Sequence, residues 1–370
     1  MKKILFISCI STNLYLFRLG LMKKLKEEGF EIIAAAGMDD YTDKLKQEGF
    51  KFLPLKVDRK GLNPVKDFLL FIRIMAIIKK EKPDLVLNFT IKPVIYASFC
   101  GYFLDVRIMD VITGLGYAFI QDSILKKFIK ILYRLALKKA DIVIFQNPDD
   151  RKYFITEAMV TKPKSFVITS SGVNTGYFSP MKANRDKGVS FLFIGRLLWD
   201  KGIGEYLQAA GIVKEKYPDA RFKILGWIDK GNPAAISQRH LDKYIQKGIV
   251  EYLGYQKDIR PFVAASDVVV LPSYREGVPH SLMEAASMKK PLIATDAVGC
   301  REVVEHGKNG LLVPLKDPKA LSEAMILLIK RPMTRIKMGY LGRKKMEKEF
   351  DEKIVVKKYH GVILKELEEE

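Results

Sequence analysis

Short apolar runs recur along the whole chain, and a turn and a helical pattern follow most of them. The first half contains such runs at 3–9, 31–36, 50–55, 84–89, 106–112 and 141–146, and the second half contains them at 190–194, 221–225, 250–253, 268–271, 292–294 and 311–313. Alternating strands and helices favour parallel sheets with helices on both faces. A chain of 370 residues can bury two ordinary cores, so the pattern predicts an α/β protein with two similar halves.

Turn-forming residues mark the junction between the halves. Ser, Gly, Asn and Pro cluster at 170–180. We therefore predict a first domain at 1–180 and a second at 181–348. A last helical pattern follows, and we assign 349–370 to a terminal helix.

The charge and the cysteines narrow the choice of partner and compartment. The net charge of +20 favours a negatively charged partner, but no nucleic-acid-binding motif accompanies it, so we expect no nucleic acid. Cys9, Cys100 and Cys300 lack metal-ligand or redox spacing, which predicts reduced thiols in a cytosolic protein. No apolar run reaches about 18 residues, so no membrane-spanning helix is predicted.

Two stretches carry residues suited to a diphosphate and a sugar. In 268–284 a buried strand leads through a tight loop containing Glu276 into a helix, with Pro279 expected in the first helical turn and Glu284 further along. The free N–H groups of a helix start bind anions, and the two carboxylates suit sugar hydroxyls. On spacing alone, two surface glutamates at a strand–helix corner remain an equal alternative.

The second stretch is 191–202, again a strand, a turn and a helix start. It places Arg196 and Lys201 five residues apart beside glycines. Arginine forks onto phosphate oxygens and lysine acts as a point charge. Each of these two cations has surface ion pairing as its alternative role.

Together the stretches resemble the retaining glycosyltransferases of family 4. The family's hallmark is Gly-Arg-Leu…Lys-Gly followed by Glu-Gly-x-Pro-x-x-x-x-Glu, which matches 195–202 and 276–284 here. The resemblance implies the GT-B fold, with two Rossmann-like domains facing across a cleft and a terminal helix crossing back to the first domain. It also implies a UDP-sugar donor.

The resemblance assigns roles residue by residue. Arg196 and Lys201 would neutralise the departing diphosphate without a metal. Glu276 would contact the donor sugar and Glu284 the ribose hydroxyls. The expected donor-binding set is Arg196, Lys201, Glu276, Gly277, Val278, Pro279, Glu284, Thr113, Gly114 and Gly116, and the expected catalytic set is Glu276, Arg196 and Lys201. No protein nucleophile is named, because retention is usually explained by front-face attack; a covalent intermediate on Glu276 would replace that picture.

The first half is similar to a narrower subgroup, which adds N-acetylgalactosamine to undecaprenyl-diphosphate-linked saccharides. The similarity rests on 13–18, 90–93 and 112–119. It implies that Asn13, Arg18 and Lys92 meet the acceptor, and strand-end turns with a surface arginine are the alternative. These segments follow parallel strands and should share one sheet edge.

The sequence departs from the family pattern at two places. Residues 11–13 stand where many members have Gly-Gly, and His280 stands where arginine is common. Both departures affect how the donor sugar is held.

A helical pattern at 123–140 is basic and amphipathic. Its cationic stripe is Lys126, Lys130, Arg134 and Lys138, and its apolar face is Leu125, Phe128, Leu132 and Leu135. Such a helix can lie on anionic lipid, and a solvated outer face is the alternative. We therefore expect a cytoplasmic protein that is peripheral on the inner face of the membrane.

Several motifs are absent from the sequence. It contains no Asp-x-Asp, no Gly-x-Gly-x-x-Gly after a strand and no P-loop, and its histidines lack metal spacing, so we expect no metal and no cofactor. The leading hypothesis is a metal-independent, retaining transfer of a sugar, such as an N-acetylhexosamine, from a UDP-sugar to an undecaprenyl-diphosphate-linked saccharide. The alternatives are transfer to a lipopolysaccharide core or a soluble acceptor and, in another class, an epimerase of UDP-N-acetylglucosamine.

Overall fold

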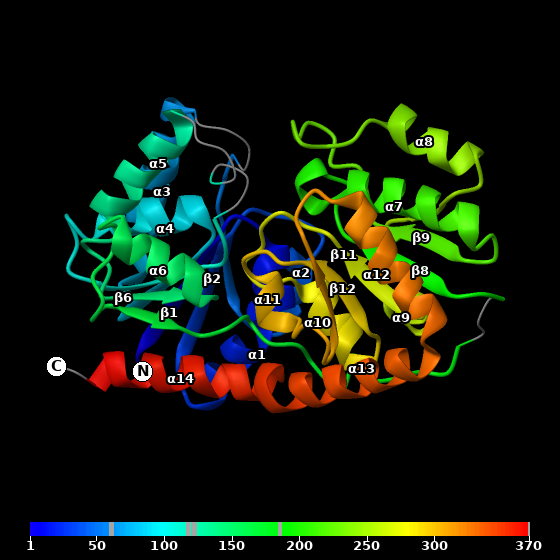
Figure 1. Cartoon of the computed structure of the whole chain (residues 1–370). Coiled ribbons are helices and arrows are strands. Elements are labelled where there is room, and N and C mark those ends of the chain that lie inside the picture. Colours follow the sequence, from blue (N-terminus) through cyan, green and yellow to red (C-terminus); the bar gives the residue numbers. More distant parts are fainter. Residues whose placement is uncertain (59–62, 116–118, 120–123, 184–186, 369–370) are drawn as a thin grey trace. The chain divides into compact units, whose positions relative to one another are not determined.

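The structure, a computed structural model, describes residues 1–58, 63–115, 119, 124–183 and 187–368 (Figure 1). The chain divides into two compact units. Unit 1 comprises Met1–Gly172 and Glu352–Glu370, and unit 2 comprises Val173–Asp351. Residues 173–180, which the sequence assigned to the first domain, therefore belong to unit 2. Among the described residues, no helix combines the length and the apolar character needed to cross a membrane.

Unit 1 contains a seven-stranded parallel sheet with the order β3-β2-β1-β4-β5-β6-β7. Its strands are β1 (Lys3–Ser8), β2 (Glu31–Ala36), β3 (Lys51–Pro54), β4 (Leu85–Phe89), β5 (Arg107–Ile112), β6 (Ile142–Phe145) and β7 (Ser165–Val167). Its helices are α1 (Ser11–Glu27), α2 (Thr42–Gln47), α3 (Pro64–Glu81), α4 (Ile91–Cys100), α5 (Ile124–Ala136), α6 (Pro148–Thr156) and α14 (Glu352–Glu368). Strand β7 was not predicted, because three residues are too few to show a periodic pattern.

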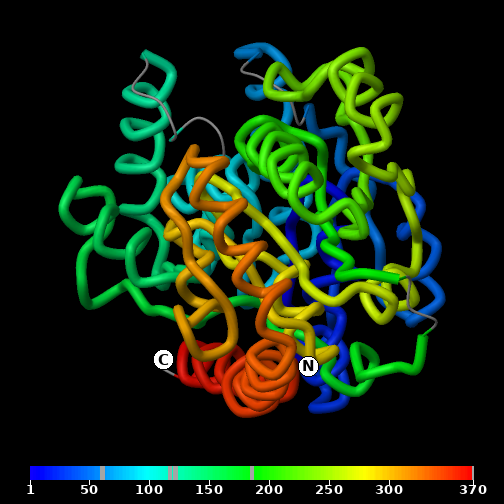
Figure 2. Tube along the Cα trace, turned by 45° about the vertical axis from the view of Figure 1, so that its right-hand side comes forward, coloured from blue at the N-terminus to red at the C-terminus, as the bar shows by residue number. Residues whose placement is uncertain are grey.

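Both faces of this sheet are covered, as its nearly continuous apolar strands require. Successive strand side chains point to opposite faces. In β1, Ile4 and Phe6 pack with α1 and α14, whereas Leu5 and Ile7 pack with α3 and α4. The last helix, α14, runs beside α1, as Figures 1 and 2 show in red and blue.

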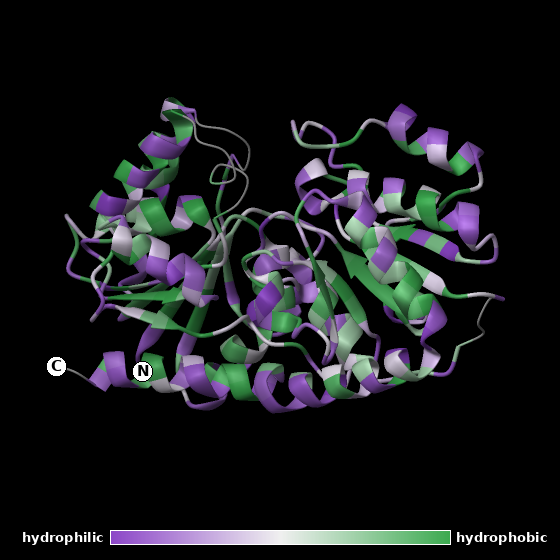
Figure 3. Cartoon of the chain, in the orientation of Figure 1, coloured by the Kyte–Doolittle hydropathy of each residue, from purple (hydrophilic) through white to green (hydrophobic). Residues whose placement is uncertain are grey.

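Unit 2 contains a six-stranded parallel sheet with the order β10-β9-β8-β11-β12-β13. Its strands are β8 (Ser190–Ile194), β9 (Arg221–Leu225), β10 (Glu251–Gly254), β11 (Val268–Leu271), β12 (Leu292–Thr295) and β13 (Gly310–Val313). Its helices are η2 (Trp199–Lys201), α7 (Ile203–Lys216), α8 (Gln238–Gln246), α9 (Arg260–Ala265), α10 (His280–Ser287), α11 (Cys300–Val303), α12 (Pro318–Lys330), α13 (Pro332–Lys345) and η3 (Met346–Phe350). Figure 3 shows the strands mostly in green, and their side chains form the centre of one large core.

The sheet order of unit 2 explains where its motif residues meet. Strands β8 and β11 are neighbours and parallel, although about seventy-five residues separate them along the chain. The loops that follow them therefore leave the sheet at the same edge. The α/β class and the parallel strands predicted from the sequence are confirmed.

Candidate active site

The centre of the site in unit 2 is an ion pair between two loops. Lys201 ends η2, which follows β8, and Glu276 lies in the loop after β11. The Lys201 ammonium donates to both Glu276 carboxylate oxygens, at 2.6 Å to Oε2. The side chains are only 18% and 11% exposed, so the pair is partly withdrawn from water. The structure thus brings together two residues that the sequence motifs had selected separately.

Two glycines fix the loops that carry this pair. Gly202, directly after Lys201, has φ +74°, and a Cβ there would lie 2.0 Å from the carbonyl oxygen of Pro272. Gly299 has φ +83°, and its Cβ would lie 2.4 Å from the carbonyl oxygen of Gly277. Only glycine adopts a positive φ without strain where another backbone segment of the same chain lies this close.

Hydrogen bonds join the same two loops behind the ion pair. The carbonyl of Asp200 accepts from the Tyr274 N–H at 2.9 Å and from the Ser273 hydroxyl at 3.1 Å. The Tyr274 hydroxyl donates to Glu205 at 2.6 Å. Burial raises the pKa of Asp200, and its Oδ1 is enclosed without a hydrogen-bond partner among the described residues. The loops are therefore positioned by bonds that do not involve Lys201 or Glu276.

Arg196 occupies the same strand edge but has a different partner. It lies two residues after the end of β8, and its Nη1 lies 3.2 Å from Oδ2 of Asp229 in the loop after β9. Its side chain is 43% exposed, so its guanidinium remains accessible to a ligand. A single exposed ion pair of this kind contributes little to stability, which favours a binding role.

Helix α10 supplies the remaining predicted donor contacts. Its first residue is His280, so Pro279 precedes the helix instead of occupying its first turn, with φ −74° and ψ 114°. Proline has no side-chain oxygen to cap the first N–H groups, which leaves that end suited to an anion. Glu284 is half-buried in the helix, and desolvation raises its pKa to about 7. Val278, in the loop before the helix, is buried.

Unit 1 holds the residues that the sequence assigned to the acceptor. Asn13 lies in the first turn of α1, which begins at Ser11 where a loop was expected, and Asn13 Oδ1 is buried without a partner among the described residues. Lys92, in the first turn of α4, is buried, and its Nζ lies 2.7 Å from Oδ1 of Asp67 in α3. Thr113 and Gly114 follow β5, whereas Gly116 lies outside the described residues.

Arg18 is enclosed in the core of unit 1. It is 3% exposed, and its guanidinium lies 4.4 Å from the ring centre of Phe89 and 5.8 Å from that of Tyr359. Burial lowers its pKa. This placement between β4, α1 and α14 favours a structural role.

Helix α5 differs from its predicted pattern. Lys130 pairs with Glu157, and Arg134 donates to the Glu157 carbonyl at 2.9 Å, so half of the stripe contacts the chain just after α6. Lys126 is half-buried, and Lys138 is exposed beyond the end of the helix. The face that packs on the core consists of Ile129, Tyr133 and Ala136. The predicted apolar face is largely exposed, namely at Leu125, Phe128 and Leu135.

Sequence reasoning missed two groups of residues at the strand edge of unit 2. Asp229 and Glu205 position Arg196 and Tyr274, and nothing in the local sequence distinguishes them from surface acids. Trp227 and Tyr255 are exposed and pack edge to face, with ring centres 5.5 Å apart. Trp227 follows the glycine after β9, and Tyr255 follows the glycine that ends β10. An aromatic residue after a strand-end glycine was the sequence signal that could have found them. No group of three or more metal-ligating side chains occurs in the described part of the chain.

Comparison with known proteins identifies the family. Residues 188–331 match the family of glycosyl transferases group 1, and residues 3–147 match the glycosyl transferase 4-like family. The chain is a group 1 glycosyltransferase.

The relatives of this glycosyltransferase include enzymes that act on lipid-linked saccharides. It is 28% identical to the N,N'-diacetylbacillosaminyl-diphospho-undecaprenol alpha-1,3-N-acetylgalactosaminyltransferase of Campylobacter jejuni, covering 96% of each chain. It is 29% identical to the UDP-Gal:alpha-D-GlcNAc-diphosphoundecaprenol alpha-1,3-galactosyltransferase of Escherichia coli, covering 72% of each. Anabaena HepE, solved with UDP-glucose, has the same fold, with a TM-score of 0.80, 18% identity and coverage of 99% and 100%. The fold of this glycosyltransferase is therefore GT-B, as predicted.

Proposed function

We propose that this glycosyltransferase transfers a sugar, such as an N-acetylhexosamine, from a UDP-sugar to an undecaprenyl-diphosphate-linked saccharide, with retention of anomeric configuration and without a metal. The observation that carries the proposal is the Lys201–Glu276 pair, which joins the two motif segments at one strand edge. The relatives support the choice of acceptor, because both act on diphosphoundecaprenol-linked sugars.

The chemical step needs a partner for the charge that develops on the departing UDP. The bond between the sugar's C1 and the diphosphate oxygen breaks, and the acceptor hydroxyl forms its bond to C1 on the same face. The acceptor proton passes to the leaving diphosphate oxygen, so no protein nucleophile is required. Lys201 and Arg196, together with the start of α10, provide preorganised positive charge for that diphosphate.

The carboxylates hold the donor in this mechanism. Glu276, steadied by Lys201, accepts hydrogen bonds from hydroxyls of the donor sugar. Glu284 accepts from the ribose, and it does so best as a carboxylate, above its raised pKa of about 7. Gly277 and Val278 shape the loop around the diphosphate, and Thr113 and Gly114 remain proposed contacts of the donor sugar.

The acceptor places the protein at the membrane. We propose a peripheral protein at the inner face of the cytoplasmic membrane, where Lys126, Lys138 and the exposed apolar side chains of α5 meet anionic lipid. Asn13 and Lys92 remain the proposed acceptor contacts.

A transfer assay with isolated components tests the proposal. Undecaprenyl-diphosphate-linked saccharides in phospholipid vesicles are incubated with a panel of UDP-sugars, with and without a chelator, and the product linkage is determined by NMR. We expect one UDP-N-acetylhexosamine to give an α-linked product at an undiminished rate in chelator. A β-linked product from an α-linked donor would overturn retention, and hydrolysis of a UDP-sugar without transfer to the lipid-linked saccharide would overturn the lipid acceptor.

A further inference from the structure

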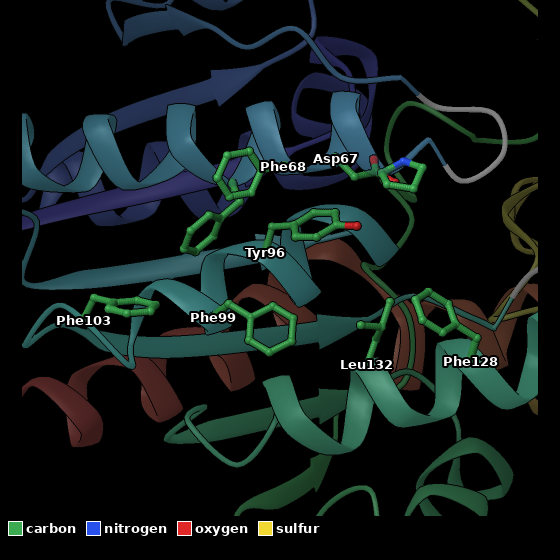
Figure 4. Close-up of a pocket in the computed structure, with 9 residues that line it drawn as sticks. Asp67, Phe68, Tyr96, Phe99, Phe103, Phe128 and Leu132 are labelled. Atoms are coloured by element: carbon green, nitrogen blue, oxygen red, sulfur yellow. The ribbon is translucent and has the colours of Figure 1, made fainter.

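Unit 1 contains an aromatic pocket between three helices. Its volume is about 340 Å³, at the lower end of the range of about 300–1,000 Å³ typical of ligand sites. Six of its nine lining residues are aromatic. The lining residues are Pro64, Asp67, Phe68, Phe71, Tyr96, Phe99, Phe103, Phe128 and Leu132, from α3, α4, the turn after α4, and α5 (Figure 4).

The pocket has a polar end and an apolar end. Figure 4 shows Asp67 and the Tyr96 hydroxyl at one end and Phe103 at the other. At the polar end, the lining residue Asp67 forms a buried ion pair with Lys92, with 2.7 Å between Lys92 Nζ and Asp67 Oδ1. Lys92 lies in the first turn of α4, directly beyond β4, so this end is directed toward the strand edge where ligands of parallel sheets bind. Burial and the Asp67 charge raise the pKa of Tyr96 to about 12, so its hydroxyl stays protonated.

The surface around the pocket is unusually apolar. Among the described residues, eleven of the twenty-five large hydrophobic side chains that are exposed lie on α3, α5 and the turn after α4. They are Val65, Phe68, Leu69, Ile72, Tyr102, Phe103, Ile124, Leu125, Phe128, Ile131 and Leu135. Such a concentration marks a surface that meets another apolar body.

Basic side chains accompany this apolar surface. Residues 124–140 contain six lysines and arginines and no acid, and Figure 3 shows purple and green segments mixed along α5. The surface therefore complements an apolar molecule that carries negative charge.

From these features we infer that the pocket binds the isoprenoid chain of the lipid-linked acceptor, next to its diphosphate. The inference rests on the proposed function, which supplies this lipid. The first isoprene units lie against the faces of Phe71, Phe99 and Tyr96, and the chain leaves past Phe103, which is 69% exposed, toward the bilayer. The diphosphate lies beyond the polar end, on the side of Lys92.

An isoprenoid chain fits these observations better than a bilayer acyl chain or a peptide helix. Insertion into a bilayer needs only the exposed apolar faces, whereas a hollow with aromatic walls withdraws one chain from the bilayer. Rigid aromatic side chains give a preformed site of large contact area, which suits a flat, methyl-branched and unsaturated chain. A peptide would bring backbone polar groups that the apolar walls of the pocket do not satisfy.

Photo-crosslinking detects binding of the isoprenoid chain without requiring sugar transfer. The probe is farnesyl diphosphate with a diazirine on its last isoprene unit, and the labelled residues are mapped by mass spectrometry. We expect labels on the pocket-lining segments of α3, α4 and α5, removed by unlabelled polyprenyl diphosphate and much less by hexadecyl diphosphate. Labels that phosphatidylglycerol vesicles remove, but polyprenyl diphosphate does not, would show a bilayer contact only. Absence of pocket labels would overturn the inference.

Two variants and a control extend the test to the acceptor. Leu132→Trp fills the pocket, Phe103→Ala removes one exposed wall, and Phe166→Ala changes an exposed phenylalanine of β7 in the same unit. We expect the first two to raise KM for a polyprenyl-linked acceptor by about tenfold, the scale of losing one large apolar contact, and the control to leave it unchanged. The same saccharide diphosphate on a short soluble alkyl group should show no change in any variant.

The outcomes separate the inference from the proposed function. Pocket labels without any sugar transfer would contradict the function and keep the site. Transfer to the lipid acceptor with an unchanged KM in both pocket variants would contradict the site and keep the function. If Leu132→Trp does not fold, Phe103→Ala alone decides, because its side chain is already mostly exposed.

Discussion

Lys201 in unit 2 and Lys92 in unit 1 were both selected by sequence motifs, and each has a carboxylate partner in the structure. Lys201 and Glu276 belong to two loops that leave neighbouring strands at one sheet edge. Lys92 and Asp67 belong to two helices, and Asp67 lines one end of an aromatic pocket. The difference teaches that a lysine's role follows from the elements that carry it: loop pairs at strand ends can exchange partners with a ligand, whereas helix pairs hold the helices together.

The largest effect that separates the two lysines is on turnover. Lys201→Ala should lower kcat/KM by about a thousandfold, since removing one preorganised donor from a charged transition state costs about 10²–10³. Lys223→Ala is the matched control, because Lys223 pairs with Glu251 and is 17% exposed, close to the 18% of Lys201. Steady-state kinetics with circular dichroism check the result. Equal activity of the two variants would remove Lys201 from the site.

Stability is the property that Lys92→Ala should change. The substitution leaves Asp67 buried without its partner, at a cost of about 3–5 kcal/mol in the free energy of unfolding. The double variant Lys92→Leu and Asp67→Leu should recover most of that loss. Urea denaturation measures both. If the stable double variant shows an unchanged KM for the lipid acceptor, Lys92 has no direct acceptor contact.

The two lysines also show which features of the fold and the site can be predicted from the sequence. Strand positions and the α/β class were predictable, because parallel strands buried on both faces are short apolar runs flanked by turns, as at 190–194. That Lys201 and Glu276 lie close together was predictable, since both residues belong to one spaced motif, whereas their ion pair was not predicted. The burial of Arg18 and the partners Asp229 and Asp67 were not, because they depend on how elements distant in sequence pack together.

Helix α5 shows the same limit for apolar residues. Its sequence contains two apolar faces, one with Ile129 and Tyr133 and one with Leu125 and Phe128, and helical periodicity alone does not decide which face is buried. The structure buries the first face and exposes the second. The exposure of Phe128 therefore depends on tertiary packing, which the sequence pattern alone does not predict.

Glu284 and Asp110 give a second pair, one from each unit, with carboxyl pKa values raised to about 7 by burial. Glu284→Gln should weaken UDP binding by about tenfold, because an amide replaces a two-oxygen acceptor. In the wild type, UDP binding should tighten as the pH rises through about 7, where the Glu284 carboxyl ionises. Asp110→Asn, whose side chain is buried with Asn88 and Ser98, should leave UDP binding unchanged. Calorimetric titration of UDP measures the affinity of both variants. An equal loss of affinity in the two variants would contradict a contact between Glu284 and the ribose.

The same two carboxyls set a pH dependence of stability. A folded pKa above the unfolded one means that the native state binds more protons, so the stability that Glu284 contributes is fully present below about 4.5 and is lost as the pH rises through about 7. Glu284→Gln should flatten this fall in the unfolding free energy of unit 2. Urea midpoints across that range measure it, and an unchanged slope in the variant would contradict the raised pKa.

The smallest predicted effect concerns the membrane. Lys127→Glu with Lys138→Glu reverses two exposed charges at α5 and the turn after it, and each basic residue contributes about 1 kcal/mol at an anionic surface. Co-sedimentation with anionic vesicles should fall severalfold at low salt, and the difference should shrink at high salt. Unlike Lys130 and Arg134, neither changed residue contacts Glu157 in the described structure. Equal vesicle binding by the variant and the wild type would show that the basic side chains of α5 face solvent and do not contact lipid.

Titration of UDP into three proteins tests most directly the claim that unit 2 holds the donor while unit 1 holds the lipid. The proteins are the wild type, Lys201→Ala and Leu132→Trp. We predict one shared Kd for the wild type and Leu132→Trp and a Kd at least tenfold weaker for Lys201→Ala. A single Kd for all three proteins, or a weakened Kd in Leu132→Trp, would contradict this division of roles.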